Sequence, residues 1–136
     1  MGKSFTFPVT VEFEDVDSLG IAHHTRLIAY LERARVHLLQ ALGGRPLLDP
    51  ACVPVLRDLR VRFHKPARLL ASLAVVLTPE PGDGDCLKLG YDVTRGADLV
   101  VDATATIAFF DRQTGSVEPV PAGLAAALEA WKRAGP

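Results

Sequence analysis

Two aspartates and two histidines lie close together near the start of the chain, just before a segment with the apolar spacing of a helix. They are Asp15, Asp17, His23 and His24. The first turn of a helix offers unpaired backbone N–H groups and a partial positive charge. A carboxylate beside such an end can attack a carbonyl that the N–H groups polarise, or can activate water against it. The stretch 11–35 therefore predicts an active site for acyl transfer to water.

Asp17 is the candidate carboxylate, although an aspartate in a loop is more commonly a turn-forming residue. Gly20 follows in the same loop and permits backbone conformations that are closed to other residues. A carboxylate that is to be held against a carbonyl needs a fixed loop of this kind. Asp17 is therefore either a turn former or a catalytic group.

The two histidines are adjacent, so on extended backbone their side chains point to opposite sides and at most one faces the site. The other interpretation is an exposed polar pair. Thr25 has the residue type of a helix N-cap, and with Gly20 and His23 it is predicted to contact the substrate.

Other catalytic classes find less support in the sequence. A metal site made of the aspartates and histidines lacks a recognised ligand spacing such as HExxH, so no metal and no cofactor are predicted. No GxSxG motif surrounds Ser18. The acidic segment Gly82–Asp85 lacks the lysine of a phosphate loop and instead predicts a hairpin turn.

The elements that must position this site follow from hydrophobic periodicity. Alternation predicts a strand from Phe5 to Phe13, with Pro8 at an edge, a bulge or the strand start. A three-to-four spacing predicts a helix from Thr25 to Leu42, ended by glycines 43 and 44. Strands are then predicted near 53–63, 69–77, 87–94 and 99–110, followed by a terminal helix after Pro121 with a stripe of Leu124, Leu128 and Trp131. This order predicts the α+β class, with a five-stranded antiparallel sheet wrapped around one long helix.

Two further patterns concern surfaces of the predicted sheet. The apolar run 69–77 predicts a strand that is covered on both faces, with one face or edge buried in a partner subunit. Arg60 and Arg62 share a strand face with His64. They are either solvated charges or a binding site for a phosphate-bearing ligand. Glu32 either pairs with Arg35 or faces the site of a neighbouring subunit.

The overall composition is that of an ordinary globular chain. The sequence has 136 residues, a formal net charge of -1 and two cysteines without CxxC spacing. One domain over 1–136 is predicted. The charge gives no case for nucleic acid or an anionic membrane, and no long apolar run suggests a membrane span. The N-terminal residues lack the apolar core of a signal peptide, so a cytoplasmic location is expected.

At the level of motifs, FEDVDSLGIAHHTRLIAYLERAR closely resembles the opening of hotdog-fold thioesterases of the 4-hydroxybenzoyl-CoA thioesterase/YbgC-like family. That family shows a strand, then D-x-D-x-x-G-I/V-x-Y/H-H, then a helix ending in an L/F-E-R-A-R-like segment. The matching residues here are Asp15, Asp17, Gly20, Ile21, His24 and the segment 31–35. Weaker similarity extends over nearly the whole chain.

The resemblance implies a hotdog fold and an acyl-CoA thioesterase. It implies that Asp17 is the catalytic carboxylate, as nucleophile or general base, and that backbone N–H groups near His24 polarise the thioester carbonyl. The His24 side chain matches the histidine of many YbgC-like members. The resemblance also implies a homodimer or homotetramer with sites at subunit junctions. A thioester on a carrier protein is an alternative substrate, and a non-catalytic hotdog module that binds an acyl ligand is the alternative function.

Overall fold

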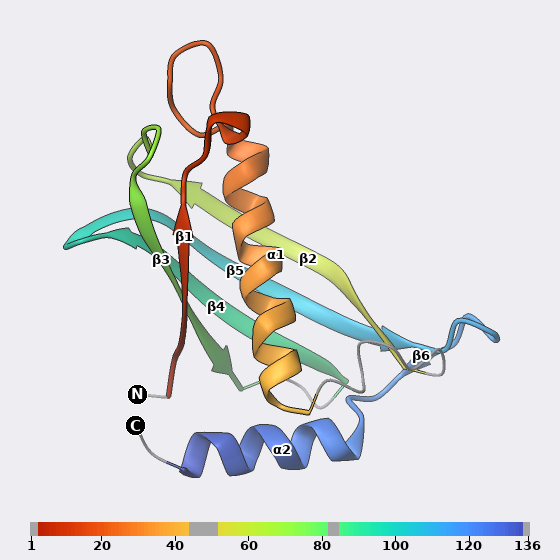
Figure 1. Ribbon diagram of the computed structural model, residues 1–136. Coiled ribbons are helices and arrows are strands. Elements are labelled where there is room, and N and C mark those ends of the chain that lie inside the picture. The colour runs from red at the N-terminus through yellow and green to blue at the C-terminus, as the bar shows by residue number, and fades with distance from the viewer. Residues whose placement is uncertain (1–2, 44–51, 82–84, 135–136) are drawn as a thin grey trace.

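The computed structural model describes residues 3–43, 52–81 and 85–134, and Figure 1 shows a curved antiparallel sheet with one long helix lying across it. The elements in chain order are β1 (Phe5–Thr10), a 3₁₀ turn η1 (Phe13–Asp15), α1 (His24–Ala41), β2 (Val53–Phe63), β3 (Ser72–Glu80), β4 (Cys86–Arg95), β5 (Asp98–Phe110), β6 (Val117–Glu118) and α2 (Ala122–Arg133). The α+β architecture predicted from the sequence is confirmed, with the short β6 added to the five expected strands.

All strand pairs are antiparallel, and the sheet order is β1-β3-β4-β5-β2, with β6 paired to β5. Strands β1 and β2 are therefore the two edges of the sheet, and an edge is one of the three positions predicted for Pro8. β4 and β5 are joined by the predicted turn at 95–98 and lie in the middle of the sheet next to β2 and β3.

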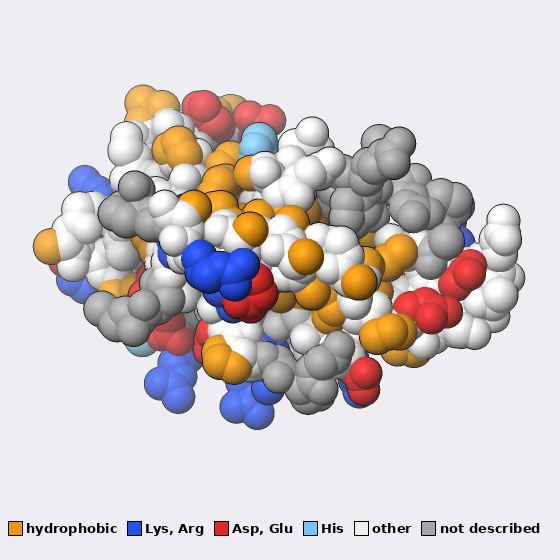
Figure 2. Space-filling model, turned by 90° about the horizontal axis from the view of Figure 1, so that it is seen from below, with side chains coloured by type: hydrophobic (Ala, Val, Ile, Leu, Met, Phe, Trp, Pro, Cys, Tyr) orange, Lys and Arg blue, Asp and Glu red, His pale blue; other side chains and the backbone are white. Residues whose placement is uncertain are grey.

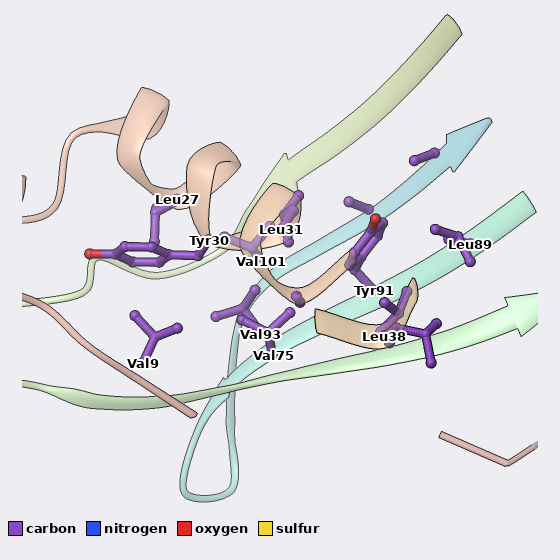
Figure 3. Packing of buried hydrophobic residues seen from close by; sticks show 14 of the residues in the cluster. Val9, Leu27, Tyr30, Leu31, Leu38, Val75, Leu89, Tyr91, Val93 and Val101 are labelled. Atoms are coloured by element: carbon purple, nitrogen blue, oxygen red, sulfur yellow. The ribbon is translucent and has the colours of Figure 1, made fainter. Parts of the chain in front are cut away.

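The core lies between α1 and the sheet, and Figure 3 shows side chains of α1 facing those of β3, β4 and β5. The residues of α1 that supply this stripe are buried at spacings of three and four: Leu27, Leu31, Ala34 and Leu38. β4 contributes alternate residues, all buried, namely Leu87, Leu89, Tyr91 and Val93. Each buried leucine stabilises the fold by about 1.5–3 kcal/mol. This packing fixes the position of α1, and hence of its N-terminus, on the sheet.

The boundaries next to α1 differ from the prediction. β1 ends at Thr10 rather than Phe13, whose side chain is 82% exposed in η1. The 3₁₀ turn forms here because the Asp15 carboxylate accepts a hydrogen bond from the Glu12 amide, which turns the chain away from the strand direction. Helix α1 begins at His24 and its N-cap is His23, whose side chain accepts from the Thr25 amide, so the N-cap predicted at Thr25 is wrong by two positions.

The strand predicted for 69–77 lies at Ser72–Glu80 instead. Leu69 and Leu70 precede it and are 41% and 67% exposed, and buried and partly buried positions alternate along β3 rather than both faces being covered. Leu70 has φ of +68°, a conformation that residues other than glycine, asparagine and aspartate seldom adopt. Burial of this strand against a partner subunit stays a prediction. The predicted hairpin turn at 82–85 and the connection after Gly43 lie largely outside the described residues.

Helix α2 lies below the lower end of α1 in Figure 1, and it buries Leu124 and Leu128 as the stripe predicted. Figure 2 views this side of the molecule from below and shows hydrophobic side chains over its middle, with basic and acidic side chains next to each other among them. Lys3 reaches α2, where its Nζ donates to the Trp131 carbonyl and lies 4.6 Å from the Trp131 ring centre. Among the helices described, none has the length and apolar character needed to cross a membrane.

Candidate active site

The loop that carries Asp17 is a small, closed turn between η1 and α1. The Asp17 amide donates to the Ile21 carbonyl at 3.0 Å, and the Gly20 amide donates back to the Asp17 carbonyl at 2.9 Å. Gly20 has φ of +75°, which explains why glycine occupies this position. Asp17 Oδ1 accepts from the Leu19 amide at 2.9 Å. The exposed Asp17 side chain is thus a turn former with one oxygen engaged by the loop.

The loop is also fastened to the segment that follows β2. The Ala22 amide donates to the Ala67 carbonyl at 2.7 Å, and the Leu69 amide donates to the Gly20 carbonyl at 3.1 Å. Isolated bridges join Val16 to Ala22 and Ile21 to Arg68. Two segments far apart in the sequence are therefore held together at the N-terminal end of α1.

A cavity of about 460 Å³ lies at this junction. Its lining comes from the acidic loop, the first turn of α1 and the end of β2 with its following turn: Asp17, Ile21, Ala22, His23, His24, Leu27, Phe63, His64, Lys65 and Pro66. The cavity combines apolar side chains with one carboxylate, three imidazoles and one amine. This is the composition expected of a small-molecule site.

The first turn of α1 leaves one backbone donor available beside the cavity. The amides of Arg26 and Leu27 both donate to the His23 carbonyl, and the Thr25 amide donates to His23 Nδ1 at 3.3 Å. The amide of His24 has no acceptor among the residues that the structure describes. The His24 ring packs against His23, with ring centres 4.2 Å apart, and meets Phe63 edge-on.

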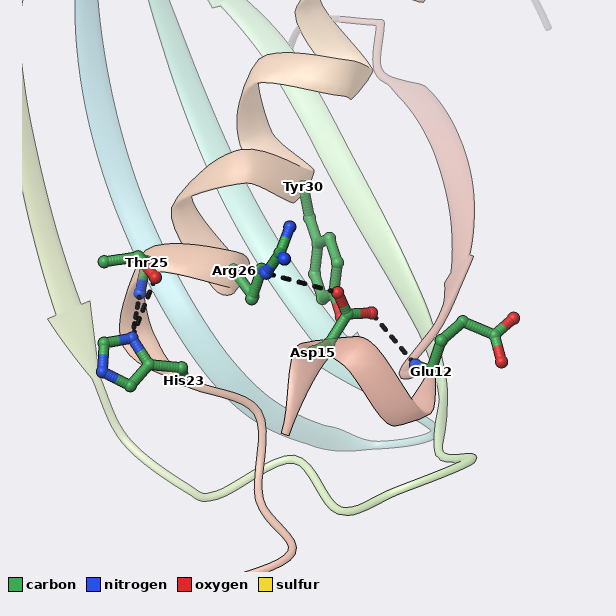
Figure 4. Close-up of polar contacts among 6 residues, drawn as sticks. All are labelled: Glu12, Asp15, His23, Thr25, Arg26 and Tyr30. Carbon is green, nitrogen blue, oxygen red and sulfur yellow. Dashed lines mark hydrogen bonds and ion pairs between the residues drawn. The ribbon is translucent and has the colours of Figure 1, made fainter. Parts of the chain in front are cut away.

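Asp15 supports this end of α1 from inside, and sequence reasoning did not anticipate that role. Figure 4 shows its carboxylate between Tyr30, Arg26 and Glu12. Asp15 is 3% exposed, and its Oδ2 accepts from the Tyr30 hydroxyl at 2.8 Å and from the Glu12 amide at 3.0 Å. Oδ1 lies 3.7 Å from Arg26 Nε. The Asp15 carbonyl also accepts from the His23 amide, which ties η1 to the helix start.

These contacts set the ionisation of the buried pair. Burial alone would raise the pKa of Asp15, but the Glu12 amide, the Tyr30 hydroxyl and the Arg26 charge outweigh it, so the pKa is lowered. The pKa of Tyr30 is raised by burial and by its hydrogen bond to Asp15. Asp15 is thus held as a carboxylate within the fold. The described residues contain no group of three or more potential metal ligands.

The structure brings together only some of the predicted site residues. Asp17, His23 and His24 line the cavity, while Gly20 and Thr25 shape its loop and helix end without lining it. Glu32 pairs with Arg35 further along α1, as one of the two interpretations predicted. Arg60 and Arg62 line a different hollow, of about 580 Å³, together with Val61, Asp102 and Thr104.

Seven lining residues were not predicted as site residues: Ile21, Ala22, Leu27, Phe63, His64, Lys65 and Pro66. The sequence shows His64-Lys65-Pro66 as the end of a strand, with His64 on the face of Arg60 and Arg62. Nothing local indicates that this turn returns to the start of α1. The turn is brought there by backbone hydrogen bonds just after it, from the Ala22 amide to the Ala67 carbonyl and from the Leu69 amide to the Gly20 carbonyl.

Comparison with known proteins places this arrangement in a family. The model of the thioesterase-like superfamily matches residues 11–128 of the chain, which include the acidic loop, α1 and the four long strands β2 to β5. The chain belongs to the thioesterase-like superfamily. Membership confirms the resemblance from which a YbgC-like hotdog thioesterase was predicted.

Among curated relatives in this superfamily, the acyl-CoA thioesterase YbgC of Haemophilus influenzae is 28% identical over 123 residues, covering 88% of this chain and 89% of that protein. The acyl-CoA thioester hydrolase YbgC of Escherichia coli O6:H1 is 34% identical over 67 residues, which are 48% of this chain. The matched part of the chain thus spans about half the length of the Escherichia coli protein, 50% of its residues.

Solved structures share the fold. A 1,4-dihydroxy-2-naphthoyl-CoA thioesterase from Synechocystis superposes with a TM-score of 0.87 at 17% identity, covering 98% of this chain and 100% of that one. A Staphylococcus aureus protein solved in complex with CoA gives a TM-score of 0.89 at 14% identity, with 100% and 88% coverage. These similarities confirm the predicted hotdog fold.

Proposed function

We propose that the chain hydrolyses an acyl thioester, with acyl-CoA as the substrate class, in the cavity at the N-terminus of α1. The observation that carries this proposal is the placement of two complementary groups on one cavity. Asp17 lines it from the loop, and His24, whose amide has no described acceptor, lines it from the helix start.

The chemistry divides between these two groups. The thioester carbonyl oxygen accepts from the His24 amide, where the partial positive charge of the helix end stabilises the oxyanion. Asp17 keeps one carboxylate oxygen in its loop turn, and its second oxygen has no hydrogen-bond partner among the described residues. That oxygen either attacks the carbonyl carbon or takes a proton from an attacking water. A thiol of pKa about 8.5 then leaves without needing a strong acid.

The lining supports a thioester with an apolar acyl portion. Leu27 and Phe63 supply apolar surface, and Lys65 supplies a positive charge at the same cavity. The names of the curated relatives favour CoA over a carrier protein as the thiol. Arg60 and Arg62 lie outside this cavity. Within one subunit they can contact a phosphate only if the ligand extends beyond the cavity.

The proposal includes a homodimer or homotetramer. β2 is an edge strand, and it ends at Phe63, which lines the cavity and is 49% exposed. A second subunit added at this edge would cover Phe63 and enclose the cavity. Light scattering on the purified chain tests this part, and a monomer at all concentrations would contradict it.

Asp17→Asn tests the catalytic assignment, with thiol release measured across a panel of acyl-CoAs. The variant keeps an oxygen for the Leu19 amide but loses the charge, so kcat/KM is expected to fall by about 10² to 10⁴-fold. Asp111→Asn is the matched control, because Asp111 accepts from the Gln113 amide in a similar turn between β5 and β6. Wild-type turnover in a folded Asp17→Asn protein would contradict the assignment. Saturable binding of acyl-CoA without hydrolysis by the wild type would instead support the binding-module alternative.

A further inference from the structure

His64 is a third imidazole on the cavity, and neither the predicted site nor the proposed roles of Asp17 and His24 include it. It follows directly after β2 and lines the cavity beside Phe63 and Lys65. Its amide donates to the Val100 carbonyl at 2.8 Å, and the Lys65 amide donates to the same oxygen at 3.3 Å. The backbone of His64 is therefore fixed against β5.

The ring of His64 is also held, by a carboxylate from β5. His64 Nε2 lies 2.5 Å from Asp102 Oδ2. Asp102 faces Arg62 on one side and Asp92 on the other in the strand register. Since an ionised carboxylate only accepts, this contact places the proton of the neutral imidazole on Nε2. Nδ1 then carries the free lone pair, and it has no partner among the described residues.

A histidine whose one nitrogen is oriented by a carboxylate and whose other nitrogen is unoccupied is the arrangement of a general base. The second nitrogen belongs to a side chain on the same cavity as Asp17. His64 thus adds to Asp17 a proton acceptor that a carboxylate holds in place, and hydrolysis by a single attacking water needs only one such group, which suggests a division of roles between the two.

We propose that His64, positioned by Asp102, is the base that activates water in a two-step hydrolysis in which Asp17 is the nucleophile. The inference rests on the proposed thioesterase function and specifies the mechanism at that site. His64 is then a catalytic residue and Asp102 a positioning residue.

Thiol release and hydrolysis of the acyl-enzyme are two separate steps. In the first, the free Asp17 oxygen bonds to the acyl carbon, the C–S bond breaks, and the thiolate leaves with the electron pair and takes a proton from solvent. In the second, a water oxygen bonds to the acyl carbon while Nδ1 of His64 takes the water proton. The bond from the acyl carbon to Asp17 breaks, its electron pair returns to the carboxylate, and the imidazolium releases its proton to solvent.

His64→Gln tests this assignment because it separates the two steps in time. With the most active acyl-CoA of the panel, rapid-quench measurements are expected to show a first equivalent of thiol per site at a near wild-type rate. Steady turnover is then expected to be slower by about 10² to 10⁴-fold. Hydroxylamine added during turnover should trap the accumulated acyl group as a hydroxamate, and Asp17→Asn should give neither the burst nor the trapped product.

Asp102→Asn and Asp98→Asn form a matched pair of controls. Asp98 also lies on β5 and binds the same turn through Lys65, with Nζ 2.9 Å from Oδ1. If Asp102 orients His64, Asp102→Asn gives the burst with slowed turnover while Asp98→Asn behaves as wild type. Equal effects of the two would mean that both merely hold the turn, and would overturn the role of Asp102.

The remaining outcomes also decide the proposal. Turnover of His64→Gln within about twofold of wild type overturns it, since general-base catalysis is worth far more. Loss of the burst together with turnover in a folded variant overturns it as well, because His64 would then act before or during thiol release. Asp102→Asn supplies the same test should His64→Gln not fold. If the wild type is inactive on every acyl-CoA, the proposed thioesterase function itself is overturned. If the wild type is active and the variants are unaffected, only the roles of His64 and Asp102 are overturned.

Discussion

The hydrogen bond from Tyr30 to Asp15 is expected to be a main stabilising contact beneath the active-site loop. Tyr30 is fully buried, and its hydroxyl donates to a carboxylate that is only 3% exposed. Tyr30→Phe removes the hydroxyl and leaves the Asp15 oxygen with one fewer donor. Hydrogen bonds to charged groups contribute about 1.5–3 kcal/mol, so the free energy of unfolding should fall by about 2 kcal/mol.

The corresponding change in melting temperature follows from the length of the chain. An unfolding entropy of about 2.1 cal/mol/K per residue, over 136 residues, gives roughly 290 cal/mol/K. A loss of about 2 kcal/mol then lowers the Tm by about 7 °C. Calorimetry or chemical denaturation of the purified variant measures both quantities.

Tyr91→Phe is the matched control, because Tyr91 is also buried, at 3% exposure, but its hydroxyl lacks a hydrogen-bond partner within the described structure. Burial raises the pKa of Tyr91, and removing a hydroxyl that is desolvated and unpaired should be neutral or stabilising by up to about 1 kcal/mol. Equal losses in the two variants, or no loss in Tyr30→Phe, would refute the reasoning that the charged acceptor makes the difference.

Two further predictions concern the same end of the molecule. Because the pKa of Asp15 is lowered from its usual 3.8, its stabilising contribution is complete well above that value and is lost as the pH falls through the lowered folded pKa. Denaturant titrations below about pH 4 should therefore show a steeper acid loss in wild type than in Asp15→Asn, and parallel curves would contradict this. Gly20→Ala should destabilise by about 1 kcal/mol through backbone strain alone, since φ is +75° and nothing lies within 4 Å of the added Cβ. An unchanged Tm would show that the loop relaxes.

The sequence was informative wherever one local pattern decided the structure. Alternation at Leu87, Leu89 and Tyr91 predicted the buried face of β4, and three-to-four spacing predicted α1. The pattern failed at Phe13, where the apolar alternation continued but the Asp15 carboxylate turned the chain into η1. A hydrogen bond from a side chain to a nearby backbone amide can override hydrophobic periodicity, and such a bond cannot be predicted from the spacing of apolar residues.

Only the part of the candidate site whose residues are close together in the sequence was predictable. Asp17 and His24 lie in one motif, so the sequence brought them together, whereas His64 enters the cavity through bonds between segments some forty residues apart. Arg60 and Arg62 were grouped with His64 by strand alternation, but they line the hollow that also contains Thr104. Placement on one strand face therefore did not predict a shared cavity.

The contact between Lys3 and Trp131 brings the first described residues, just before β1, and the last helix together at one end of the molecule. The acidic loop and the start of α1 lie at the opposite pole in Figure 1. A short linker joining the two ends would thus close the chain into a ring without crossing the cavity. Circular permutants opened in a surface turn, and surface-immobilised forms tethered at either end, should leave the cavity unobstructed.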